Sequence, residues 1–192
     1  VQRAVVRAAA MAGRWPDAAA GAVAICHRRE SIDEEAIASL RDAVSALDEW
    51  AEFVAAFEAA LVTAPAGDLQ LARDLDLLCA RWYRDECSDD AAAAAAAARA
   101  VARAPDHVGA LTLLAELQRG TNDPAVVETL VALDRASSGT IEHLRAAAEL
   151  ACADGVGTAR ARELVAALHG KAAHLLHTGP GSEAAADAVR WA

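Results

Sequence analysis

Turn signals recur along this chain at a nearly constant spacing, and that recurrence constrains the fold more than any other feature. Between the turns, apolar residues repeat with the helical period, as Leu111, Leu114 and Leu117 do. The positions that mark the turns are Trp15, Trp50, Asp90, Pro124 and Thr158. Their regular recurrence, with one longer step between Trp50 and Asp90, predicts repeated helix pairs that stack on one another.

Helical periodicity and capping signals place a helix in almost every part of the chain. Ser31 and Glu34 match a capping box, and Asp123 with Pro124 matches a cap followed by a first-turn proline. No alternating run of β-branched and aromatic residues is long enough to predict a hairpin. The predicted helices cover residues 2–12, 16–28, 33–47, 49–63, 68–86, 89–103, 107–118, 123–135, 140–153, 158–177 and 182–192.

Small side chains dominate the apolar residues, since hydrophobic residues make up 55% of the chain and aromatic residues only 4%. The alanine run at 91–98 follows Asp89 and Asp90 and precedes Arg99 and Arg103, charges that complement the dipole of a helix at both ends. We expect this run to be a packed helix, because small side chains let two helices approach closely. The two aspartates are then helix caps rather than calcium ligands.

In residues 68–118 a helix with large side chains precedes a turn, a helix lined with small side chains follows, and a proline closes it. The residues of this pattern are Leu78, Ala80, Tyr83, Ala93, Ala97, Ala100 and Pro105. Together with the spacing of the turn marks, the pattern resembles the tetratricopeptide repeat family, in particular its degenerate bacterial members rich in alanine and arginine. Repeats of that family are about 34 residues long.

The resemblance implies an all-α fold, a right-handed α-solenoid of stacked antiparallel helix pairs with about 10–11 helices. It implies a single repeat domain over residues 1–192. The approximate units are 1–29, 32–64, 68–104, 107–136, 140–178 and a partial unit 182–192. Because the chain begins at Val1 rather than at a methionine, we expect it to be a piece of a longer protein.

The charge of the chain argues against nucleic acid or an anionic membrane as a partner, because the net charge is −10. No apolar run approaches the roughly 20 uncharged residues of a membrane span. Residues 1–30, in contrast, carry an excess of three positive charges, so a basic face is expected near the N-terminus. The four cysteines lack paired spacing, which predicts reduced thiols and a cytoplasmic location.

Motifs that carry catalysis or bind cofactors are missing from the sequence. It contains no nucleophile elbow, phosphate loop or dinucleotide fingerprint, so we expect neither enzymatic activity nor a cofactor. His174 and His177 lie three residues apart on one predicted helix that also carries His169. No cysteine or carboxylate stands at ligand spacing from them, so we expect no metal site.

A helical repeat array offers an extended concave surface that suits a peptide or a helix of another protein. We therefore predict a non-catalytic protein–protein interaction scaffold. The alternative is a spacer or self-association module of a larger multidomain regulatory protein, acting through the open ends of the solenoid. The repeat register places on the concave face Arg3, Arg7, Glu35, Asp42, Trp82, Thr112, Glu116, Arg119 and His143.

The tryptophans divide between core and surface in this register. Trp15 and Trp50 stand at the start of second helices, where the resemblance implies packing between units. Trp82 falls on the groove side of a first helix. We expect it to be exposed in the free protein and to anchor a partner, because tryptophan is enriched among binding hot spots.

Overall fold

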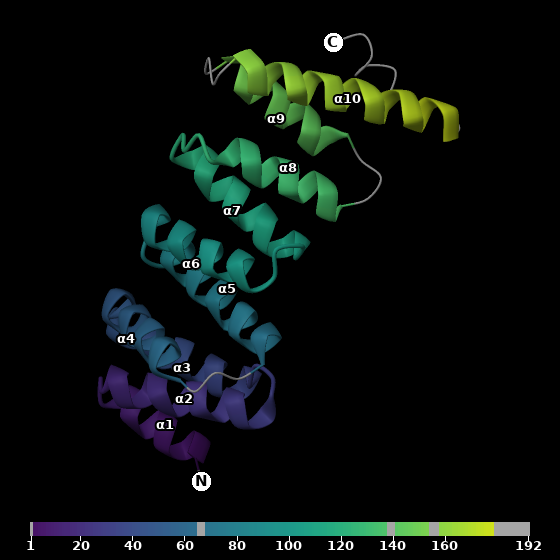
Figure 1. Ribbon diagram of the computed structural model, residues 1–192. Coiled ribbons are helices and arrows are strands. Elements are labelled where there is room, and N and C mark those ends of the chain that lie inside the picture. The colour runs from purple at the N-terminus through teal and green to yellow at the C-terminus, as the bar shows by residue number, and fades with distance from the viewer. Residues whose placement is uncertain (1, 65–67, 138–140, 154–157, 179–192) are drawn as a thin grey trace. The chain divides into compact units, whose positions relative to one another are not determined.

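The computed structural model describes residues 2–64, 68–137, 141–153 and 158–178. These residues form ten helices and, within the described ranges, no strand, which confirms the all-α prediction (Figure 1). The predicted helix at 182–192 lies outside the described residues. In chain order the helices are α1 (Gln2–Met11), α2 (Trp15–Arg29), α3 (Glu34–Leu47), α4 (Trp50–Thr63), α5 (Leu69–Asp85), α6 (Asp90–Arg103), α7 (Val108–Gly120), α8 (Val126–Ala136), α9 (Glu142–Ala153) and α10 (Thr158–Thr178).

The chain divides into two compact units, Val1–Ala104 with helices α1 to α6 and Pro105–Ala192 with helices α7 to α10. The division falls between two of the helix pairs that the repeat register predicts. In the first unit, α1 packs against both α2 and α3, α2 packs against α4, and α5 packs against α4 and α6.

Side-chain contacts in the first unit join each second helix to the second helix of the next pair. Trp15 Nε1 donates to Glu49 Oε2 at 2.6 Å, which links the starts of α2 and α4. Arg99 Nη2 on α6 lies 2.5 Å from Glu58 Oε1 on α4. The helices α2, α4 and α6 are the ones that Trp15, Trp50 and Asp90 mark in the sequence. The contacts therefore follow the order of the turn marks.

The core of the first unit contains an aromatic cluster between α2, α4 and α5. Phe53 on α4 is fully buried, and its ring centroid lies 5.7 Å from that of Trp15 and 5.2 Å from that of Trp82. Phe57, one turn further along α4, meets the Trp82 ring edge to face at 5.1 Å. At this point the helices thus pack through a few large rings.

The alanine run forms the buried side of α6, as the sequence predicts. Ala93, Ala96, Ala97 and Ala100 are fully buried, and α6 packs along α5. The Asp89 carboxylate accepts a hydrogen bond from the Ala92 N–H at 2.9 Å, which confirms its role as the cap. This close packing depends on side chains no larger than a methyl group.

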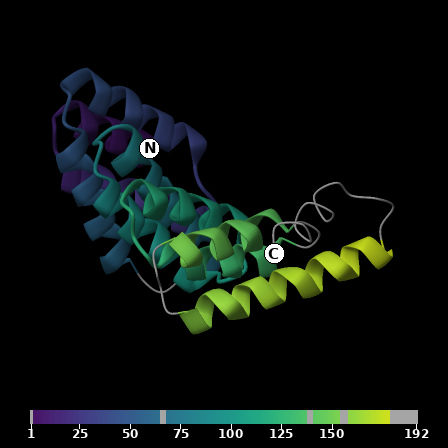
Figure 2. The ribbon, with the colours of Figure 1, turned by 90° about the horizontal axis from the view of Figure 1, so that it is seen from above.

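In the second unit the helices pack in sequence, α7 on α8, α8 on α9 and α9 on α10, and Figure 2 shows α9 and α10 side by side. Two ion pairs connect α8 with α10. Arg160 Nη2 lies 2.7 Å from Glu128 Oε2, and Lys171 Nζ lies 2.7 Å from Asp134 Oδ1. These pairs join the second helices of two successive predicted units, as the contacts of the first unit do.

One predicted cap and one predicted helix start are wrong. Ser31 does not cap α3; its hydroxyl donates to the Arg29 carbonyl, and the cap is Asp33, whose carboxylate accepts from the Ala36 N–H at 3.0 Å. The α8 helix begins at Val126 rather than at 123. Asp123 accepts from the Ala125 N–H at 2.9 Å, and three N–H groups from Val126 onward bond three residues back, so a tighter turn precedes the helix.

The cysteines are all free thiols, with Cys26 and Cys79 buried, Cys87 half-buried and Cys152 exposed. Across the described helices, none is both long enough and apolar enough to cross a membrane.

Candidate functional site

Four of the nominated residues lie on two adjacent helices of the first unit, Arg3 and Arg7 on α1 and Glu35 and Asp42 on α3, and we name their surface the α1/α3 face. Residues four apart, like the two arginines, and seven apart, like the two acids, lie on one side of a helix. Arg3 Nη1 forms an ion pair with Glu35 Oε2, which joins the two helices. The side chains of Arg3 and Glu35 are 41% and 71% exposed, so the ion pair is accessible to solvent.

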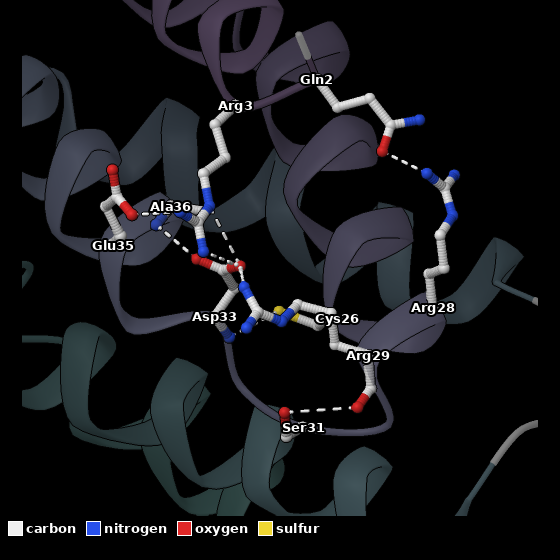
Figure 3. Close-up of polar contacts among 9 residues, drawn as sticks. All are labelled: Gln2, Arg3, Cys26, Arg28, Arg29, Ser31, Asp33, Glu35 and Ala36. Atoms are coloured by element: carbon white, nitrogen blue, oxygen red, sulfur yellow. Dashed lines mark hydrogen bonds and ion pairs between the residues drawn. The ribbon is translucent and has the colours of Figure 1, made fainter.

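Beside this face lies a pocket of about 270 Å³, which we name the arginine pocket. It forms where the start of α1 meets the last turn of α2 and the turn that leads into α3 (Figure 3). Its lining residues are Gln2, Arg3, Ile25, Arg28, Arg29 and Asp33. Three of the six are cations, whereas one is an anion.

Asp33 is the buried centre of the pocket wall, with a side chain that is 0% exposed. Its Oδ2 accepts from Arg3 Nη2 at 2.7 Å and from Arg29 Nη1 at 2.5 Å, while its Oδ1 caps α3. The Arg3 hydrogen bond, helped by the Ala36 N–H and Arg29, lowers the pKa of Asp33 to about 2 against the opposing effect of burial. Asp33 is therefore ionised at neutral pH and fixes two arginines at the pocket.

The backbone of Asp33 is held by a hydrogen bond to a buried thiol. The Asp33 N–H donates to Cys26 Sγ at 3.4 Å. Burial raises the pKa of Cys26, so the group stays a neutral thiol at neutral pH. Cys26 thus anchors the turn before α3 without adding a negative charge to the pocket.

Arg28 differs from the other two arginines in its partner. It is exposed, and its Nη1 donates to the uncharged Gln2 Oε1, as Figure 3 shows. Among the described residues, no carboxylate forms an ion pair with Arg28. Within the described residues, Arg28 therefore lines the pocket without an ion-pair partner.

The expectation that Trp82 is an exposed groove residue is wrong. Trp82 is only 4% exposed, and its ring lies against Phe53 and Phe57. The physical reason is that α5 packs against α4, so the side of α5 that carries Trp82 meets the rings of α4. Trp15 is buried as predicted, whereas Trp50 is only half-buried and covers the edge of the same cluster.

The remaining nominees belong to the second unit. Thr112, Glu116 and Arg119 lie on α7, with Thr112 half-buried and the other two exposed; His143 is half-buried on α9. The Thr112 hydroxyl donates to the Val108 carbonyl at 2.9 Å, within its own helix. Their place on a binding surface stays a prediction.

The histidines of α10 lie on its exposed side where they are described. His169 and His174 are exposed, and the side chain of His177 lies outside the described residues. Within the described residues, no three His, Cys, Asp or Glu side chains come together as metal ligands would.

Comparison of the chain with protein-family models, with curated proteins and with solved structures finds no match. The resemblance to tetratricopeptide repeats thus remains a hypothesis that the sequence pattern alone carries.

Three pocket residues, Arg28, Arg29 and Asp33, were not nominated from the sequence. The repeat register places groove residues on first helices only, whereas these three residues stand at the end of a second helix and in the following turn. The signal that points to the two arginines is the basic excess of residues 1–30.

Proposed function

We propose that this chain is a non-catalytic interaction scaffold that binds a peptide or a helix of another protein, and that the α1/α3 face is part of its binding surface. The supporting observation is that four residues nominated from the sequence lie on two adjacent helices, joined by the Arg3–Glu35 ion pair. Charged side chains at such a surface set specificity and association rate more than affinity.

The charges on the α1/α3 face are of both signs, with arginines on α1 and acids on α3. Glu35 and Asp42 are two turns apart, about 10 Å along α3. A partner segment with acidic residues over α1 and basic residues over α3 complements this arrangement. A segment whose charges are all of one sign is repelled by one of the two helices.

Site-specific photo-crosslinking tests the proposal. A photoreactive amino acid replaces Arg7 or Asp42 in the full chain, and a matched control carries it at Ala20, an exposed position on α2. We expect both face positions to capture one protein from an extract of the source cells, while position 20 does not. The captured protein must then bind the purified chain directly. Equal capture at all three positions, or none, contradicts the proposal.

Self-association is the second candidate, and one feature favours it. An apolar cleft of about 170 Å³ lies between α1 and α2, lined in part by Val5, Val6, Ala24 and Ile25. Val5 is 60% exposed. Sedimentation of the wild-type chain and of Val5→Glu separates the two functions, since only self-association predicts a dimer that the charge disrupts. A monomer at all concentrations contradicts this second candidate.

A further inference from the structure

The arginine pocket concentrates positive charge on a protein whose net charge is −10. Asp33 pairs with Arg3 and Arg29, and Glu35 pairs with Arg3, so two carboxylates are set against the three arginines that line the pocket. Within the described residues, Arg28 and Arg29 each donate one side-chain hydrogen bond, from Nη1, so most of their N–H donors remain available. The pocket can therefore donate several charge-assisted hydrogen bonds to an oxyanion.

An apolar residue also lines the pocket. Ile25, one turn before the arginines on α2, is buried to 7% exposure and contributes to the pocket wall. An oxyanion carried on a short aliphatic stem matches this combination, because its methylene groups contact Ile25 while its charge meets the arginines.

Acidic residues flank the lining residues of the pocket in the sequence, and one of them, Glu35, pairs with Arg3. Glu30, Glu34 and Glu35 are exposed on the turn and the first turn of α3. They repel an extended polyanion such as nucleic acid or an anionic membrane surface. A single carboxylate on an otherwise neutral or basic segment avoids that repulsion.

We propose that the arginine pocket binds one acidic side chain, aspartate or glutamate, of a partner peptide, whose basic residues lie along Glu35 and Asp42. This inference rests on the proposed function and names the class of partner. The carboxylate replaces Gln2 as the acceptor at Arg28, in the pocket that Arg29 also lines. No covalent step is involved.

Nuclear magnetic resonance titration of the full chain tests the pocket without a known partner. The probe is N-acetylglutamate N-methylamide, and the matched control ligand is its glutamine analogue. We expect saturable shifts of the Arg28 and Arg29 side-chain N–H signals with the probe only. Arg28→Gln is expected to weaken binding about tenfold through loss of charge-assisted hydrogen bonds. Arg14→Gln, at an exposed arginine paired with Asp17, leaves it unchanged.

Three results overturn the proposal. One is equal shifts with the glutamine analogue, and another is shifts at Arg14 as large as those at Arg28. The third is equal affinity for N-acetylalanine, because a chain-terminal carboxylate is then as good a ligand as an acidic side chain. Failure of the proposed function is distinguishable: the pocket still binds the probe, but crosslinking at positions 7 and 42 captures no partner.

Discussion

Replacing Trp82 by alanine removes the ring that connects α5 to the aromatic residues of α4. Trp82 is 4% exposed, and its ring centroid lies 5.2 Å from that of Phe53 and 5.1 Å from that of Phe57. The substitution leaves a cavity beside the rings of Phe53 and Phe57, and packed neighbours of this kind do not expand to fill it.

Truncation of a buried tryptophan to alanine costs about 3–5 kcal/mol, and each lost ring pair accounts for about 0.5–1.5 kcal/mol beyond area burial. We therefore expect Trp82→Ala to lower the free energy of unfolding by about 3–5 kcal/mol. Trp50→Ala is the matched control. Trp50 is half-buried and meets Phe53 at 6.1 Å and Trp82 at 6.2 Å, so its removal is expected to cost about half as much.

Urea unfolding followed by far-ultraviolet circular dichroism measures both variants, since the signal of the helices does not depend on which tryptophan remains. A Trp82→Ala variant that loses less than about 1 kcal/mol, or less than Trp50→Ala, refutes the reasoning. Either result means that Trp82 faces solvent, as the repeat register alone predicts.

Three further changes test other parts of the structure. Ala97→Leu is expected to destabilise the chain by about 1–3 kcal/mol, because Ala97 is fully buried against α5; a neutral effect in urea unfolding contradicts that packing. Asp76→Ala leaves Arg99 and Arg103 without their buried acceptor and is expected to cost about 1–3 kcal/mol, and an unchanged unfolding midpoint contradicts the ion pairs. Asp33 has a pKa of about 2 against an ordinary 3.8, so its stabilising effect is full above pH 3.8 and disappears as the pH falls through 2. The difference in unfolding free energy between wild type and Asp33→Asn should therefore shrink over that range, and a constant difference contradicts the account.

The sequence alone predicts the helices of the described residues well, because alanine-rich helices between strong turn signals leave few alternatives. The observed α2 (Trp15–Arg29) and α6 (Asp90–Arg103) each lie within one residue of their predicted bounds at both ends. One error arises where two residues compete for one cap. Asp33 rather than Ser31 takes the α3 cap, because its carboxylate also pairs with Arg3 on α1, a distant partner that local pattern does not reveal.

The repeat register does not predict the orientation of α5. A uniform repeat places Trp82 on the groove side, but α5 packs against α4, and its tryptophan meets Phe53 and Phe57. The longer step between the turn marks Trp50 and Asp90 indicates the same irregularity in the sequence. A longer step shows that a unit departs from the pattern, yet it does not show which side of the helix becomes buried.

The candidate site is predicted only in part, for a similar reason. Arg3 and Glu35 are assigned to one surface from periodicity, and their contact agrees with that assignment. The arginine pocket depends instead on the close approach of three segments, the start of α1, the end of α2 and the turn at Asp33. Tertiary proximity of this kind has no periodic signature.

Calorimetric titration of the captured partner tests the central claim, that the α1/α3 face binds another protein, most directly. The variants are Arg7→Glu with Asp42→Lys on the face and Arg14→Glu as the control outside it, each first shown to be folded by circular dichroism. We predict at least about tenfold weaker binding for the face variant, a loss that decreases at high salt, and unchanged binding for the control. Wild-type affinity in the folded face variant contradicts the claim.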